Sequence, residues 1–308
     1  MKVIPFSALR PQRSLALRVA SYPYDLLSRE EYRSLAEDEA SFLHIIRSDI
    51  DLSDDINEYD EQVYALAKAN LDKFLSQQTL QADDKDYFYV YEEVMKGRKQ
   101  LGLVCGVALA EYAQGRICRH ELTLEPKVLD RMKHMEAVKA QTGSVFLTYQ
   151  DDGQLNCLLE DYCLEKEPEY HFIFPPNGVS QKLWLLQDDD LSCRIRQLIA
   201  AMDKFYVVDG HHRLEAAYRL SLKNPQKETY QWAMSVLFPA SQLLNMANDR
   251  IIGGASLLDK AEVFRKIEMV CRVEEAKSAF RPDRPRRLGF YFQGQWYQLF
   301  FKDDFALD

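Results

Sequence analysis

The segment from Phe205 to Leu220 limits the possible folds more than any other part of the sequence. It begins with a short apolar run, Phe205 to Val208, which predicts a buried strand. The pair Asp209-Gly210 then predicts a turn, and the apolar residues after it recur with a helical period: Leu214, Ala217, Tyr218 and Leu220. The sequence therefore predicts a strand that passes through a tight turn directly into a helix.

The turn itself has the sequence Asp209-Gly210-His211-His212-Arg213. A helix N-terminus presents unpaired backbone N–H groups and the positive end of the helix dipole, and both favour a bound anion. Gly210 permits a positive φ or the close approach of a ligand, and Arg213 can bind a phosphate or carboxylate through two hydrogen bonds. The turn therefore predicts a phosphate-binding site. The glycine patterns of a P-loop or a dinucleotide-binding fingerprint are absent from it.

A structural interpretation of the same turn stays open. Asp209 could cap the helix, and the two histidines could face solvent or pair with nearby carboxylates. Because four specialised residues follow one another at one turn, we favour the binding site.

A second group of polar residues, Arg119-His120-Glu121-Leu122-Thr123, precedes a helix that we expect to begin at Pro126. A glutamate beside a histidine and an arginine can act as a general base with electrostatic support. The alternative is a salt-bridge cluster that joins strand to helix, and spacing alone slightly favours this alternative.

The turn also resembles a known family. Asp209 to Arg213, followed by Glu215, is similar to the Asp-Gly-x-His-Arg signature of the ParB/sulfiredoxin-like superfamily. Further stretches narrow the resemblance to one branch, the domain-of-unknown-function family 1015 (DUF1015). These stretches are Ile4-Pro5-Phe6, Leu9-Arg10-Pro11, Pro23-Tyr24-Asp25, Phe42 to Arg47, Arg119 to Thr123, Lys127 with Asp130-Arg131, and Gly143 to Leu147. They occur in family order and cover most of the chain.

The resemblance implies a ParB/sulfiredoxin-like nucleotide-binding core with nucleotide phosphates at the turn. The superfamily includes partition proteins that hydrolyse nucleoside triphosphates, sulfiredoxin, and a kinase that phosphorylates free L-serine. Gene neighbourhoods of the family often contain enzymes of serine biosynthesis. We therefore expect a nucleotide-dependent kinase or phosphatase that acts on a small hydroxy-amino acid such as serine, with ATP or ADP and Mg²⁺ as cofactors.

Phosphoryl transfer requires cationic groups around the transferred phosphoryl group and a base or orienting group for the acceptor. The resemblance then implies the following roles. The catalytic candidates are Glu121, Asp209, His211 and His120. The candidates for phosphate or nucleotide binding are Gly210, His211, His212, Arg213 and Arg119. Tyr24 and Asp25 become a wall of the site. The sequence leaves the metal ligands, the acceptor and the oligomeric state open.

The sequence leaves two other functions open. One is a nucleotide-binding regulator without catalysis. The other is a DNA-associated ParB-like protein, which the net charge of −9 and the lack of a basic helix disfavour. The one dense basic run, Arg281 to Arg287, is interrupted by Pro282 and Pro285. We therefore expect a small-molecule substrate and no nucleic-acid partner.

The cysteines, the N-terminus and the apolar runs indicate where in the cell the protein is expected. Six cysteines lack Cys-x-x-Cys spacing and mostly lie in apolar contexts, which predicts buried free thiols. None is close to His211 in sequence, so the thiol repair chemistry of sulfiredoxin is not expected. The N-terminus does not resemble a signal peptide, and no apolar run approaches the roughly 18–20 residues of a membrane span. We expect a cytoplasmic protein without a membrane partner.

The pattern of strands and helices predicts a mixed α/β or α+β fold. We expect one domain over residues 1–252, with a C-terminal helix and hairpin in 253–308 packed on it. The expected strands are 3–6, 87–94, 101–109, 145–149, a pair within 153–183, 205–208, 230–238, 288–292 and 296–301. The expected helices are 56–75, 126–140, 188–201 and 257–270, with Asp188 to Asp190 as a solvated cap more than a cation site. We expect His134 and His171 to be surface or satisfied core histidines.

Overall fold

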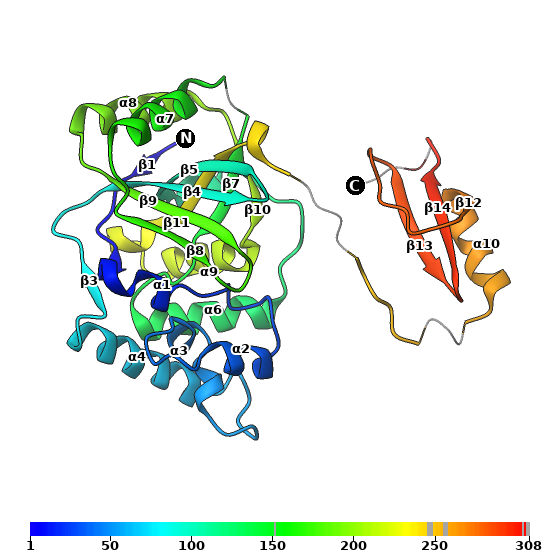
Figure 1. Ribbon diagram of the computed structural model, residues 1–308, viewed down its shortest axis with the longest axis horizontal. Helices are drawn as coiled ribbons and strands as arrows, with labels where there is room; N and C mark the ends of the chain where they lie inside the picture. The colour runs from blue at the N-terminus through cyan, green and yellow to red at the C-terminus, as the bar shows by residue number, and fades with distance from the viewer. Residues whose placement is uncertain (151, 245–248, 255–257, 304, 306–308) are drawn as a thin grey trace. The chain divides into compact units, whose positions relative to one another are not determined.

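The computed structural model describes residues 1–150, 152–244, 249–254, 258–303 and 305. The chain divides into two compact units, Met1–Leu243 and Leu244–Asp308. The fold is a mixed α/β fold, as the sequence predicts (Figure 1). Among the described residues, no helix combines the length and the apolar character that a membrane crossing requires.

The larger unit is built on a nine-stranded mixed sheet with the order β6-β10-β7-β11-β5-β4-β9-β8, and β1 pairs with β5 outside this path. Its strands are β1 (Val3–Ile4), β4 (Phe88–Met95), β5 (Arg98–Ala108), β6 (Ile117–Cys118), β7 (Val145–Tyr149), β8 (Tyr170–Phe174), β9 (Val179–Leu186), β10 (Phe205–Asp209) and β11 (Trp232–Pro239). Two short strands, β2 (Leu9–Pro11) and β3 (Leu80–Ala82), pair separately.

One strand pair fixes the position of the predicted site. β10 runs parallel to β6, with Phe205 opposite Ile117, and antiparallel to β7. Because parallel strands end at the same edge of a sheet, the residues after β6 and the residues after β10 emerge side by side. The segments that contain Glu121 and His211 are therefore brought together by the sheet itself.

Helices cover both faces of this sheet. They are α1 (Ala16–Val19), α2 (Arg29–Leu35), α3 (Leu43–Ile46), α4 (Glu61–Ser76), α5 (Leu109–Ala113), α6 (Glu125–Val138), α7 (Gln154–Glu165), α8 (Asp189–Ala201) and α9 (His211–Lys223). Figure 1 shows α7 and α8 on one side of the sheet, with α6 and α9 on the other and α2 to α4 beyond them. The main hydrophobic core joins the sheet to both layers, for example through Leu159 of α7, Ile195 of α8 and Leu214 of α9.

The smaller unit contains α10 (Lys260–Val270) and a three-stranded antiparallel sheet. Its strands are β12 (Cys271–Ala276), β13 (Arg287–Phe292) and β14 (Gln295–Phe301), and Phe264 of α10 packs on Phe290 and Tyr297. The hairpin at the end of the chain is confirmed, whereas β12 was not predicted. Leu257, where the last helix was expected to begin, lies outside the described residues. Packing of this unit on the larger one stays a prediction.

Three sequence predictions need correction. The strand pair expected within 153–183 is present as β8 and β9, but the first part of this stretch forms α7, which buries Leu155, Leu159 and Tyr162 at helical spacing. The helix expected from residue 56 begins at Glu61, where the Asp60 side chain accepts a hydrogen bond from the Gln62 N–H group and caps it.

The cysteines are the third case. All six are free thiols, as predicted, but only two of them are buried, Cys105 and Cys271. Cys157 and Cys193 are exposed, since each lies on the outer face of a helix in the layer of α7 and α8. The prediction that most of the thiols are buried is therefore wrong.

Candidate functional site

The predicted strand–turn–helix is present at the end of β10. Gly210 is the N-cap of α9 and has φ of +92°, a left-handed conformation that favours glycine. A Cβ atom at this position would also lie 3.0 Å from Nε of Arg213. No side chain in the described part of the chain caps α9, so the first backbone N–H groups of this helix lack a side-chain acceptor. The turn thus has the backbone arrangement of an anion site.

Arg213 joins this turn to the segment before β7. Its guanidinium donates to the Ser144 carbonyl at 2.7 Å and to the Asp209 carboxylate, and its side chain packs against Gly143. Nε of Arg213 is buried and has no hydrogen-bond partner. Two of the three guanidinium nitrogens predicted to bind phosphate therefore already hold the turn together.

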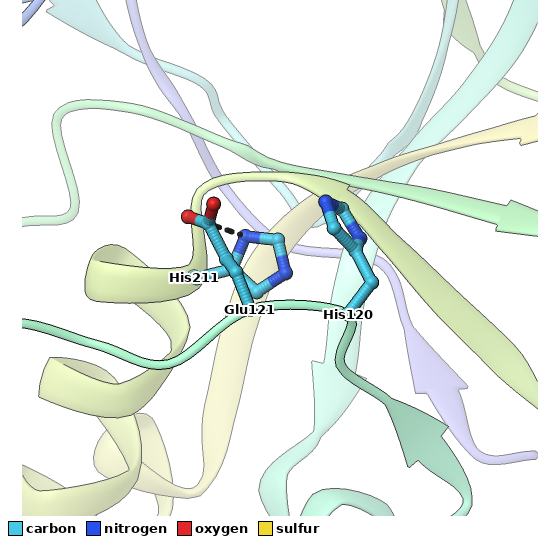
Figure 2. Close-up of side chains that lie close together, drawn as sticks. All are labelled: His120, Glu121 and His211. Carbon is cyan, nitrogen blue, oxygen red and sulfur yellow. Dashed lines mark ion pairs between the residues drawn. The ribbon is translucent and has the colours of Figure 1, made fainter. Parts of the chain in front are cut away.

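His120 is anchored on the backbone of β10. Its Nδ1 donates to the Val207 carbonyl at 2.8 Å, since a carbonyl can only accept. In the neutral ring, Nε2 of His120 therefore carries a free lone pair. The His120 ring meets the His211 ring edge to face, with centroids 4.4 Å apart (Figure 2).

Glu121 lies next to Nδ1 of His211. Its Oε1 is 3.4 Å from this nitrogen (Figure 2). The Glu121 side chain is 51% exposed, whereas the His211 side chain is 2% exposed and its Nε2 has no partner. Burial lowers the pKa of His211, and the Glu121 carboxylate acts in the opposite direction. A carboxylate open to solvent thus lies next to a buried imidazole.

His212 connects two helices. Its Nε2 accepts a hydrogen bond of 3.1 Å from the backbone N–H of Leu124, which places the start of α6 beside the start of α9. Burial lowers the pKa of His212, Lys127 lowers it further, and Glu121 and Asp25 act in the opposite direction. The N-termini of α6 and α9 therefore lie close together, near the charged side chains of Lys127, Glu121 and Asp25.

Arg119 lies apart from this group. Its guanidinium contacts Oε2 of Glu215 at 3.7 Å and lies over the Tyr112 ring. Glu215 also accepts hydrogen bonds from Tyr112 and Arg219. Among the described residues, the ion pair of Arg119 is with Glu215 and not with Glu121 or Asp209, and its phosphate-binding role stays a prediction.

Of the predicted wall, Tyr24 lies beside Arg213, and Asp25 acts electrostatically on His212. Tyr24 covers the Arg131 guanidinium at 3.9 Å and lines a cavity of about 50 Å³ together with Arg213. Tyr24 and Asp25 also line an adjacent cavity of about 190 Å³, which Lys127 borders. Burial raises the pKa of Tyr24 to about 12. Both cavities are smaller than the roughly 300–1,000 Å³ of typical ligand pockets.

The sequence did not reveal the groups that hold these side chains in place. They are backbone atoms: the carbonyls of Val207 and Ser144 and the N–H of Leu124. Every residue has such backbone groups, so the sequence does not show which of them will act as hydrogen-bond partners. Only the Gly143-Ser144 pair, just before a predicted strand, indicates a backbone position of this kind.

Comparison with known proteins adds the family. Residues 3–307 match the family described as "Protein of unknown function (DUF1015)". The chain belongs to this family. The match extends beyond the stretches noted in the sequence and includes the C-terminal unit. No curated protein and no solved structure matches the chain.

Proposed function

We propose that this DUF1015 protein catalyses nucleotide-dependent phosphoryl transfer, as a kinase or phosphatase, on a small hydroxy-amino acid such as serine. One observation carries the proposal: the uncapped N-terminus of α9 begins at the residue whose ring faces the Glu121 carboxylate at 3.4 Å. An anion site and a proton acceptor are thereby adjacent.

The phosphate half of the proposal rests on the two helix ends. α9 has 13 residues, and its first N–H groups, at residues 211–213, are free of side-chain caps. The start of α6 is tied beside it through His212 and Leu124. Two positive dipole ends and the Lys127 ammonium favour phosphate oxygens at this position.

The acceptor half rests on Glu121. Its carboxylate is half exposed, so a substrate hydroxyl can reach it, and His211 lies behind it. In this role Glu121 accepts the hydroxyl proton as the oxygen attacks the phosphoryl group. Mg²⁺ is held by one or two carboxylates together with nucleotide phosphates. Asp25 and Asp209 also act electrostatically on His212, so further carboxylates lie around the turn for a Mg²⁺–nucleotide complex.

A second function, nucleotide binding without catalysis, has one observation in its favour. Asp209, the other carboxylate of the turn, is already paired with Arg213. A turn closed in this way suits a regulator whose bound nucleotide is recognised by a partner.

The experiment begins with binding. ATP and ADP, each with and without MgCl₂, are added to the purified protein, and unfolding is followed by thermal shift. A nucleotide at roughly 100 times its Kd should stabilise the protein by about 2.7 kcal/mol. Phosphorylated or dephosphorylated serine is then sought by mass spectrometry. Absence of binding and turnover would reject both functions, and binding without turnover would select the regulator.

Two variants test phosphate binding and proton acceptance separately. Glu121→Gln keeps the shape of the side chain and loses its basicity, so nucleotide binding should persist while turnover falls by about 10² to 10⁴-fold. Arg213→Lys cannot bridge Asp209 and Ser144 and should weaken nucleotide binding. The control is Arg196→Lys on the exposed face of α8, which should change neither quantity.

A further inference from the structure

We propose that His120, Glu121 and His211 form a binding site for a divalent first-row transition-metal ion, for which zinc is the first probe. One potential ligand atom from each of the three residues lies within 4.8 Å of the other two. No other such group of histidine, cysteine or carboxylate side chains occurs among the described residues. This inference does not rest on the proposed phosphoryl transfer.

The spacing of Glu121 and His211 matches two ligands of one ion. A direct hydrogen bond between charged groups has a length of about 2.7–2.9 Å. Two atoms bound at about 2.0–2.1 Å to a tetrahedral ion are about 3.3 Å apart. The observed separation between Oε1 of Glu121 and Nδ1 of His211 is 3.4 Å. The pair is therefore too open for a tight hydrogen bond and wide enough to share an ion.

His120 is held as metal-binding histidines usually are. Such a ring donates the N–H of its other nitrogen to a carboxylate or carbonyl, which fixes the ring and its tautomer. Nδ1 of His120 donates to the Val207 carbonyl of β10. Its Nε2 thus keeps a lone pair on a ring whose orientation is set by a strand of the central sheet.

His211 is almost completely buried, at 3% exposure. Its Nδ1 lies 3.4 Å from Oε1 of Glu121, too far for a tight charge-assisted hydrogen bond, and it is the nitrogen that an ion shared with Glu121 would bind. Buried polar atoms without a good partner are rare in proteins. An ion would give Nδ1 the partner that the protein does not, whereas Nε2, which is buried without a hydrogen-bond partner, would carry the ring proton.

The ligand set indicates the class of ion. Two imidazoles and one carboxylate suit Zn²⁺, Fe²⁺, Mn²⁺ or Co²⁺, whereas Mg²⁺ and Ca²⁺ prefer oxygen ligands. Three protein ligands leave a coordination position open, as in catalytic and not structural zinc sites. Solvent can reach that position, because His120 and Glu121 are both exposed.

This role and the proposed base role use the same carboxylate. Glu121 cannot bind a metal ion and accept a proton through the same oxygen lone pair. The two proposals therefore fail separately: nucleotide binding and turnover test the base, whereas metal affinity in the absence of nucleotide and substrate tests the ligand.

The test uses untagged full-length protein freed of metal by a chelator. Equilibrium dialysis against ZnCl₂ should give one zinc ion per chain, and Co²⁺ should give visible absorption bands of a low-symmetry site. His120→Ala and Glu121→Gln, both at exposed positions, should each weaken zinc binding by more than about tenfold. His171→Ala, an exposed histidine of β8, is the matched control and should bind zinc as the wild type does.

Folding of each variant is checked by circular dichroism and by its melting temperature, so that loss of zinc is not loss of structure. The proposal is overturned if wild-type protein binds zinc no more tightly than His120→Ala and Glu121→Gln do. It is also overturned if His171→Ala loses as much affinity as they do.

Discussion

Two polar clusters lie near the N-terminal half of α6, and they differ in how completely their hydrogen bonds are made. The buried cluster consists of Tyr24, Tyr64, Asp130 and Arg131. Asp130 accepts a hydrogen bond from Tyr64 at 3.0 Å and pairs with Arg131 at 2.6 Å, while the Tyr24 ring covers the guanidinium. The turn cluster consists of His120, Glu121 and His211, and it leaves a 3.4 Å gap and a buried nitrogen without a partner.

The difference separates a structural network from a binding site. In a medium of low dielectric constant, a completed polar network stabilises one arrangement of its members, whereas an incomplete one is costly. The buried cluster should therefore contribute to folding. The turn cluster should contribute little to folding and much to ligand binding. Both came from segments that matched the family, so the sequence alone could not separate them.

The largest expected effect is on the buried cluster. Asp130→Asn leaves the Arg131 charge buried without compensation, since both side chains are 9% exposed. Removing one partner of a buried ion pair costs about 3–5 kcal/mol, which urea denaturation would measure. Asp161→Asn, at an exposed position of α7, is the control and should change stability by less than about 0.5 kcal/mol. A loss below about 1 kcal/mol for Asp130→Asn would show that the network is dispensable.

His134 gives the same region a pH dependence. Burial and, next, the charge of Arg131 lower the pKa of His134 to about 4, and the hydrogen bond to the Ile45 carbonyl and Asp130 act in the opposite direction. The unfolded chain, with a pKa near 6.5, then binds more protons, so stability is full above about pH 6.5 and falls towards pH 4. The loss should be at most about 3 kcal/mol. His134→Gln should flatten the stability profile over this interval, and an unchanged profile would contradict the assignment.

Gly210 connects stability to the turn cluster. Gly210→Ala meets both an unfavourable φ and the Arg213 side chain, whereas Gly115→Ala, with φ of +72°, meets only the former because no atom lies within 4 Å. Gly210→Ala should therefore lower the free energy of unfolding by about 1–3 kcal/mol more than Gly115→Ala does, as measured by urea denaturation. Equal losses would show that Arg213 moves aside freely.

The smallest expected effect is the most diagnostic for the turn cluster. Glu121→Gln in ligand-free protein should change the free energy of unfolding by less than about 0.5 kcal/mol, because the side chain is half exposed and its contact with His211 is open. Differential scanning calorimetry would measure this. A loss of about 2 kcal/mol or more would place Glu121 among the structural residues.

The sequence predicted those parts of the fold whose signals are local. The Asp209-Gly210 pair marked the turn before α9, and the strands expected over 87–94 and 101–109 are present as β4 and β5. Two elements gave weaker signals. α7 carries closely spaced apolar residues that resemble a strand, and β12 alternates charged residues such as Arg272 and Glu274 on an exposed face.

The site was predictable only in part, for a related reason. The identities of His120, Glu121 and His211 drew attention to them, and the parallel pairing of β6 with β10 brings them together. The contacts of Arg119 and Arg213 could not be predicted, because they are made with tertiary partners that the local sequence does not reveal. Arg119 pairs with Glu215, and Arg213 donates to the Ser144 carbonyl. A cation in a motif can bind a ligand or the protein itself, and only its neighbours decide.

The most direct test of the turn cluster as a ligand site is a crystal structure of the protein grown with ADP and Mg²⁺. The account predicts phosphate oxygens within hydrogen-bonding distance of the backbone N–H groups of residues 211–213, with the Glu121 carboxylate on the same side. The main rival position is a hollow of about 690 Å³, which is lined by α7 and α8 residues such as Asp161 and Arg194. A nucleotide bound there, with the turn at Gly210 unchanged and empty, would contradict the account.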